Sequence, residues 1–189
     1  GDAQCHTVRI RGAIVHTPRG REITLRDDRV HALVIDRAQL DRTLAERAQG
    51  AGATLVTETR AEMVQREEGG MRLTIRRKGR RSTLDVPLVI GADGSRSVIA
   101  RSLGERVPSE AILAGGGEVA AQTLASDMVE VFVRPDLAPG WFAWTIPIDG
   151  KVARIGIGSS DWSRSPRRLL QDLVGQYTHL RGAPFLRLQ

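Results

Sequence analysis

The stretch LVIGADGSRSVIARSLG at residues 88–104 places an apolar strand directly before a glycine-containing turn and a short helix. Gly91 and Gly94 let the backbone turn tightly and approach a ligand closely. A helix N-terminus offers free N–H groups that favour an anion. Asp93 is a poor phosphate ligand because of its charge, but its carboxylate can accept bonds from backbone N–H groups, a ribose hydroxyl or water. The spacing is therefore compatible with a nucleotide-binding turn and equally with a plain strand-to-helix turn that Asp93 caps.

The composition is that of an ordinary globular chain. It has 189 residues, of which 41% are hydrophobic and 26% charged, with a formal net charge of +6. The single cysteine, Cys5, excludes an intrachain disulfide, and the four histidines lack metal-ligand spacing, so no metal is expected. No apolar run reaches the length of a membrane span, and we expect no signal peptide. We expect a cytoplasmic location and leave peripheral membrane contact open.

Basic residues gather in one run, RRKGRR at residues 76–81. The run surrounds Gly79 between two strand-like segments, which is typical of a solvated hairpin turn. A cluster of arginines can also bind nucleic acid, but single-strand binding needs interleaved aromatic side chains, and none accompany this run. We therefore expect no nucleic-acid partner.

Hydrophobic periodicity predicts an α+β fold. The first half should hold strands at 8–17, 21–25 and 31–36, a helix that begins at Asp36, another strand at 53–59, a three-stranded meander at 63–93 and a short helix at 95–103. The strand–helix–strand order around Asp36 predicts a parallel portion. The second half should hold strands at 118–125, 128–135, 140–149 and 152–160 and a helix that Ser165 caps, a pattern typical of an antiparallel sheet.

Residues 91–97, GADGSRS, closely resemble the DG motif of flavoprotein monooxygenases and their relatives, which share the p-hydroxybenzoate hydroxylase fold. In that superfamily the Asp-Gly pair lies close to the pyrophosphate of FAD. VIDRAQLDRTLAERAQGAGATLV, residues 34–56, resembles the arginine-led helix of the same proteins. The resemblance implies that Arg37, Gly91, Asp93 and Gly94 bind FAD. The alternative for Arg37 is a solvated arginine at the start of a helix.

Residues 139–147, PGWFAWTIP, resemble the substrate-cavity motif P-x-x-Y-x-W-x-F-P of geranylgeranyl reductases. Phe142 replaces the tyrosine and Ile146 the phenylalanine, while Trp144 and both prolines are kept. Flavin-dependent halogenases carry a similar W-x-W-x-I-P stretch, with Phe142 here in place of their first tryptophan. The likeness within the superfamily is strongest to geranylgeranyl reductases.

Side chains alternate along a strand, so Phe142, Trp144 and Ile146 should point to one face. There they would form an apolar wall for a substrate beside the flavin, in a cavity kept dry. The alternative is that the three residues are simply the core of the sheet.

The resemblance covers only the middle of the superfamily's pattern. The sequence contains neither the G-x-G-x-x-G turn that binds the ADP half of FAD nor the later G-D motif; ILAGGGEV at 112–119 has other spacing. We therefore interpret the chain as a fragment. Residues 1–30 are expected to be strands of the substrate domain, 31–104 a partial FAD-binding domain, and 105–189 a substrate-binding sheet with a C-terminal helix.

The resemblance implies that the intact parent is an FAD-dependent oxidoreductase. The first hypothesis is a geranylgeranyl-reductase-like enzyme, in which reduced flavin delivers hydride to an alkene of an apolar, isoprenoid-like substrate. Its electron donor would be NAD(P)H or a ferredoxin-like protein. The second is a flavin-dependent monooxygenase or halogenase, and the third a non-catalytic binding module. No residue qualifies as a catalytic acid or base, and the fragment alone should be inactive and bind FAD weakly or not at all.

Overall fold

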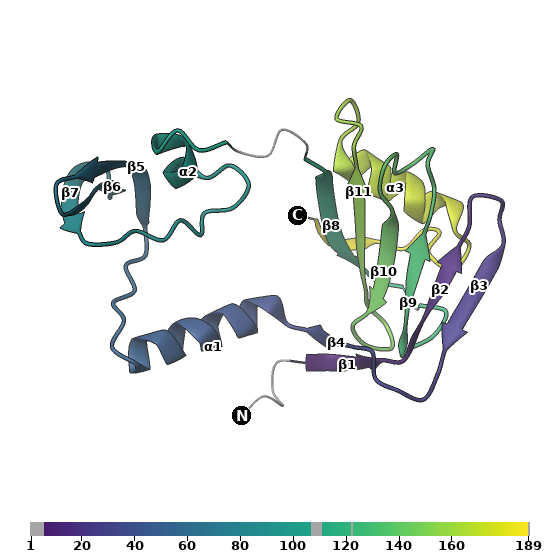
Figure 1. Ribbon diagram of the computed structural model, residues 1–189. Helices are drawn as coiled ribbons and strands as arrows, with labels where there is room; N and C mark the ends of the chain where they lie inside the picture. Colours follow the sequence, from purple (N-terminus) through teal and green to yellow (C-terminus); the bar gives the residue numbers. More distant parts are fainter. Residues whose placement is uncertain (1–5, 107–110, 122, 189) are drawn as a thin grey trace. The chain divides into compact units, whose positions relative to one another are not determined.

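The computed structural model describes residues 6–106, 111–121 and 123–188 (Figure 1). The chain divides into two compact units, one formed by residues 1–44 with 112–189 and the other by residues 45–111. These boundaries differ from the expected ones at 30/31 and 104/105, which followed the flavoprotein resemblance rather than compactness. The assignment of cofactor and substrate roles to the three regions stays a prediction.

The first unit contains a seven-stranded sheet in the order β12-β8-β11-β10-β9-β2-β3. Every neighbouring pair is antiparallel except β2 with β9. The α+β fold with a mostly antiparallel sheet is thus confirmed. The strands are β2 (Gly12–His16), β3 (Glu22–Arg26), β8 (Leu113–Val119), β9 (Met128–Phe132), β10 (Ala143–Pro147), β11 (Ala153–Ser159) and β12 (Phe185–Leu188).

Helix α3 (Pro166–Gln176) covers one face of this sheet, as Figure 1 shows. Ser165 caps it by accepting a bond from the Arg168 N–H, and Pro166 occupies its first turn, as the sequence predicts. Its four buried residues, Leu169, Leu170, Leu173 and Val174, pack into the main core with residues of β9, β10 and β11. Gly115 of β8 allows the close approach, since a Cβ there would lie 2.4 Å from Pro166 Cβ.

Two predicted strands begin or end elsewhere. The segment 8–17 forms two strands, β1 (His6–Ile10) and β2, which belong to different sheets; β1 pairs with β4 (Ala32–Ile35). The strand expected at 118–125 is β8 at 113–119, because glycines 115–117 extend it upstream and give it its contacts with β11. A run of glycines carries no apolar alternation, so periodicity could not reveal this strand.

Helix α1 (Arg37–Gly50) begins where the sequence predicts, and the Gln39 N–H donates to Asp36 Oδ1 at 3.0 Å. None of its residues is buried. The strand expected at 53–59 is wrong, because residues 53–58 form no strand and Leu55 and Val56 lie exposed. A strand exists only with a bonded neighbour, so the parallel crossover does not form within the described residues.

The second unit is built on a three-stranded antiparallel meander of β5 (Thr59–Glu67), β6 (Gly70–Arg77) and β7 (Arg80–Val86). Its turns lie at Gly69 and Gly79, both with positive φ, which confirms the predicted meander. Helix α2 (Val98–Ser102) packs against β5. The apolar run that follows β7 is not a strand, and Leu88 and Ile90 are 71% and 81% exposed. None of the helices in the described ranges combines the length and apolarity that a membrane crossing requires.

Candidate functional site

The glycine turn before α2 is organised by Asp93. Its Oδ1 accepts a bond from Ser97 Oγ at 2.5 Å, and its Oδ2 accepts bonds from the N–H groups of Val98 at 2.7 Å and Ile99 at 3.3 Å. The hydrogen bond from Ser97, with those from the two backbone N–H groups, lowers the pKa of the Asp93 carboxyl below its usual value. Asp93 is therefore an ionised side chain that fixes the turn.

The same bonds occupy the start of α2. The N–H groups of Val98 and Ile99 are bonded to Asp93, and that of Ala100 donates to Ser97 Oγ at 3.0 Å. The expectation of an anion at this helix N-terminus is thus not supported, because these donors are already used. What the turn offers is its backbone. Residues 91–94 are exposed, and Gly94 has a φ of +78°, which favours glycine.

Arg37 opens α1 with its side chain 75% exposed. Its Nε donates to Asp41 Oδ1 at 2.9 Å, one turn along the helix. An exposed pair of this kind adds little stability, so both the solvated and the cofactor-binding interpretation of Arg37 remain.

The glycine turn before α2 fits one part of an FAD site. The turn at 91–94 presents an open, glycine-containing backbone, and because its carboxylate is hydrogen-bonded to α2, the main chain of the glycines is the part that a cofactor could approach. In the other unit, Arg37 is an exposed cation at the start of α1. The described residues include no glycine-rich strand–turn–helix for the ADP half of the cofactor.

The aromatic residues of β10 lie on the sheet face opposite α3. Ala143 and Thr145 are fully buried on the α3 side, whereas Trp144 and Ile146 point the other way and are only partly buried. Of the three residues predicted to share a face, Trp144 and Ile146 do so within β10, and neither belongs to the buried core cluster. Phe142, just before the strand, is 37% exposed and lies edge-on to Trp144, with ring centroids 5.8 Å apart.

Glycines of β11 make room for the tryptophans. Trp144 pairs with Gly156 across the strands, and a Cβ on Gly156 would lie 2.1 Å from Trp144 Cζ2. A Cβ on Gly158 would lie 2.2 Å from Trp141 Cδ1. Trp141 in turn stacks on Phe142 at 5.2 Å with an interplanar angle of 13°. The indoles thus lie on bare backbone and, with Phe142, form a continuous aromatic wall, which we define as Trp141, Phe142 and Trp144.

The apolar character of this open face continues to the far edge of the sheet. Ile23 and Leu25 of β3 pair with Val15 and Ala13 of β2, on the side opposite the buried His16. Ile23 is 49% and Leu25 57% exposed. A cavity of about 110 Å³ lies at the other end of the wall, lined by Gly116, Gly117, Glu118, Trp144, Arg154, Ile155 and Arg187. The described part of the first unit thus has one face covered by α3 and another on which the aromatic wall lies beside the charged residues Glu118, Arg154 and Arg187.

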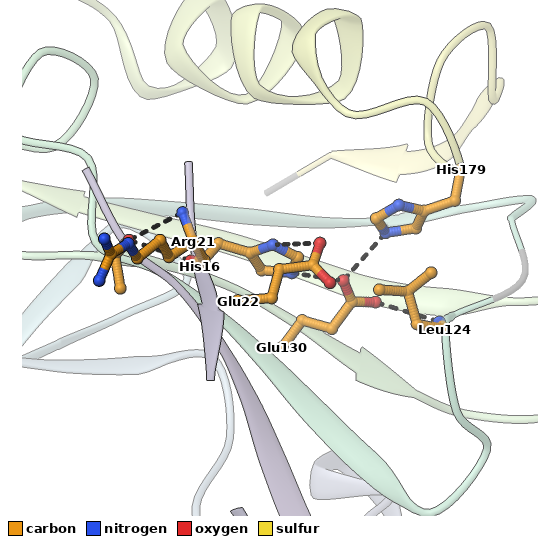
Figure 2. Close-up of polar contacts among 7 residues, drawn as sticks. His16, Arg21, Glu22, Leu124, Glu130 and His179 are labelled. Carbon is orange, nitrogen blue, oxygen red and sulfur yellow. Dashed lines mark hydrogen bonds and ion pairs between the residues drawn. The ribbon is translucent and has the colours of Figure 1, made fainter. Parts of the chain in front are cut away.

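A buried charged cluster on the α3 side escaped the sequence analysis (Figure 2). Glu130 of β9 is fully buried, and its Oε2 accepts a hydrogen bond from His16 Nε2 at 3.0 Å. His179 Nε2 lies 3.0 Å from the same oxygen, off the line of a well-formed hydrogen bond. His16 Nδ1 lies 3.3 Å from the exposed Glu22, and the Leu124 N–H donates to Glu130 Oε1 at 3.3 Å.

The contacts that Glu130 makes with two histidines keep its buried carboxylate ionised. Burial alone raises the pKa of a carboxyl, but the contacts with His16 and His179 outweigh burial and lower the pKa of Glu130 from 4.5 to about 2. His16 also stacks on Phe132 at 4.5 Å. Within the described residues no group of His, Cys, Asp or Glu side chains has the geometry of a metal site. The cluster joins β2, β9 and the segment after α3, on the face away from the aromatic wall.

One signal for this cluster existed in the sequence. MVEVF at 128–132 alternates so that Glu130 shares its face with Met128 and Phe132, which are buried. A carboxylate in such a position must have a buried partner. Which histidines supply it depends on contacts 114 and 49 residues apart along the chain, which spacing does not reveal.

Comparison with known proteins places these features in a class. The model of a family described as "FAD binding domain" matches residues 6–163. The digeranylgeranylglycerophospholipid reductase of Methanothrix thermoacetophila is 32% identical over 178 residues, which cover 87% of this chain and 45% of the relative. That of Methanocaldococcus jannaschii is 28% identical over 169 residues, covering 87% and 43%.

Solved structures share the fold. A geranylgeranyl bacteriochlorophyll reductase-like protein from Thermoplasma acidophilum superposes with a TM-score of 0.85 at 22% identity, over 100% of this chain and 50% of its own. The flavin-dependent halogenase CmlS superposes with a TM-score of 0.72 at 19% identity, over 96% of this chain and 37% of its own.

The family match shows that the chain belongs to the FAD-binding domain family, as the resemblance in its sequence predicts. It spans somewhat less than half the length of the curated relatives described above.

Proposed function

We propose that the chain is part of an FAD-dependent reductase that acts on alkenes of an apolar, isoprenoid-like substrate. The observation that carries this proposal is the aromatic wall on the open face of the sheet. Its indoles pack on the glycines of β11 and present large apolar surfaces, which suit a hydrocarbon substrate. The names of the relatives, digeranylgeranylglycerophospholipid reductases, agree with a substrate of this class.

We assign two roles to residues of the chain. Arg37, Gly91, Asp93 and Gly94 would hold FAD, with Asp93 shaping the turn and the backbone of Gly91 and Gly94 facing the cofactor. Phe142, Trp144 and Ile146 would contact the substrate. FAD, when bound, supplies hydride transfer to a carbon–carbon double bond. The protein supplies binding, orientation and the exclusion of water by the apolar face.

The reaction needs a reductant, which we propose to be NAD(P)H or a ferredoxin-like electron donor. No catalytic acid or base is assigned, because the described polar cluster around Glu130 lies on the other face of the sheet. A cytoplasmic location with peripheral membrane contact stays our prediction.

The test uses the full-length parent with chemically reduced flavin and a geranylgeranyl lipid, without oxygen. We expect saturation of the double bonds, measured by mass spectrometry as a gain of two hydrogens for each bond. The Trp144→Ala variant should lower kcat/KM by at least about tenfold, because it removes a large apolar contact. A product that forms only when oxygen is present would contradict the proposal.

The second candidate is a flavin-dependent monooxygenase or halogenase. It is favoured by the superposition with halogenases, which share the fold at low identity. Oxygen-dependent hydroxylation or halogenation in the same assay would support it. If the parent binds the lipid but transforms nothing in either condition, the third interpretation, a non-catalytic binding module, would hold.

A further inference from the structure

The turn between β6 and β7 concentrates positive charge on the second unit. Residues 76–81, which we call the basic hairpin, contain five cations around Gly79. The register places Arg76 opposite Arg81 and Arg77 opposite Arg80. Like charges directly opposite each other destabilise a pair of strands, so this end of the meander is electrostatically unfavourable for folding.

Only half of this repulsion is compensated. Glu62 of β5 contacts Arg76 Nε at 2.5 Å and Arg81 Nε at 2.6 Å, so the first arginine pair shares one carboxylate. Arg77, Lys78 and Arg80 are exposed, and no carboxylate among the described residues pairs with any of them. The tip of the hairpin therefore presents three unneutralised cations to solvent.

The backbone conformation of the turn is a second feature that lowers the stability of the hairpin. Lys78 has a φ of +47° and Gly79 a φ of +80°, as in a two-residue type I′ hairpin turn. Asparagine or glycine fits the first of these positions better than lysine, which is strained there. Uncharged residues at 77 and 80 would relieve the repulsion, and asparagine or glycine at 78 would relieve the backbone strain. Local conflicts of this kind are expected where function opposes stability.

We propose that the basic hairpin is a docking surface for an anionic membrane. Its charge is complementary to the phosphate headgroups of acidic lipids, and each cation near such a surface strengthens binding about fivefold. The β5–β7 meander contains no aromatic residue, so it lacks the stacking platform that single-stranded nucleic acid requires. The choice of a membrane rests on the proposed function, since an isoprenoid-like substrate resides in lipid.

The test measures flotation of the protein with vesicles, and it needs neither flavin nor substrate. Phosphatidylcholine vesicles that contain phosphatidylserine should bind the chain at low salt, and high salt should release it. The triple variant Arg77→Gln, Lys78→Gln and Arg80→Gln should bind about 100-fold more weakly. Its thermal midpoint should be equal or higher, because the repulsion between Arg77 and Arg80 is gone.

A matched control removes the same charge elsewhere. Arg19, Arg167 and Arg168 are exposed arginines of the first unit, and their triple replacement by Gln should leave vesicle binding within about twofold of the unchanged protein.

Three outcomes would overturn the proposal: equal losses in both triple variants, equal binding to vesicles of phosphatidylcholine alone, or hairpin-dependent binding of a single-stranded oligonucleotide without vesicle binding. Because the assay omits the reaction, failure here would leave the reductase proposal standing, and failure of the reductase assay would leave vesicle binding unaffected.

Discussion

Glu130 is the residue whose titration the structure describes best. In the folded protein its pKa is about 2, against 4.5 ordinarily. A depressed carboxyl pKa stabilises the fold above the unfolded value, and this stabilisation is lost as pH falls through the folded value. We expect the free energy of unfolding to drop by about 3 kcal/mol between pH 4.5 and 2. Urea titrations at several pH values measure this drop.

The Glu130→Gln variant should be less stable at neutral pH and should show a much smaller drop in that window. Glu22→Gln is the control, since Glu22 is 59% exposed although it also faces His16. A wild-type stability that is flat from pH 4.5 to 2 would contradict the ionised, buried Glu130.

At the scale of the strands, the packing of Trp144 depends on the pairing of β10 with β11. Replacing Gly156 by Ala places a Cβ 2.1 Å from the Trp144 ring, so the ring must move. We expect a loss of about 1–3 kcal/mol in stability, as for other overpacked sites, and a shifted tryptophan emission spectrum. Denaturant unfolding and fluorescence report the two effects.

Gly150→Ala is the matched control in the turn between the same strands, where a Cβ would meet nothing within 4 Å. It should change neither the emission spectrum nor stability by more than a few tenths of a kcal/mol. An unchanged spectrum in Gly156→Ala would show that Trp144 does not lie on this glycine.

The elements differ in how far the sequence predicts them. Helix α1 and its Asp36 cap, the β5–β7 meander and the Ser165-capped α3 depend on local signals, and all are confirmed. The segment 53–59 has strand composition but forms no strand, because pairing is not a local property. Strand β8 contains three consecutive glycines. They allow α3 and β11 to approach closely, and this close packing is not visible in the sequence.

The candidate site likewise contains features that the sequence predicts and features that it does not. Alternation on β10 correctly placed Trp144 and Ile146 on one face, but it could not show that glycines of β11 support the indoles. The Glu130 cluster was missed because its histidines lie on β2 and beyond α3. The cofactor roles of Arg37, Gly91, Asp93 and Gly94 stay predictions.

At the scale of the whole chain, the open question is cofactor affinity. The described residues offer one exposed turn and one arginine for FAD, without a glycine-rich dinucleotide turn. We expect the 189-residue chain to bind FAD weakly or not at all. Titration followed by flavin fluorescence measures this. Submicromolar affinity, lost in Asp93→Ala but kept in Asp85→Ala, would show that the chain holds a complete cofactor site.

The seating of indoles on glycines has a consequence for engineering. Strand β11 contributes only main chain beneath Trp144 and Trp141, so the chemistry of the aromatic wall is encoded almost wholly by the short segment 141–146. A library that varies positions 141, 142, 144 and 146 while keeping Ala143, Thr145, Gly156 and Gly158 could reshape the surface without repacking the core, whose residues point the other way. Substrate range and fold stability would then be adjustable as separate properties of one sheet.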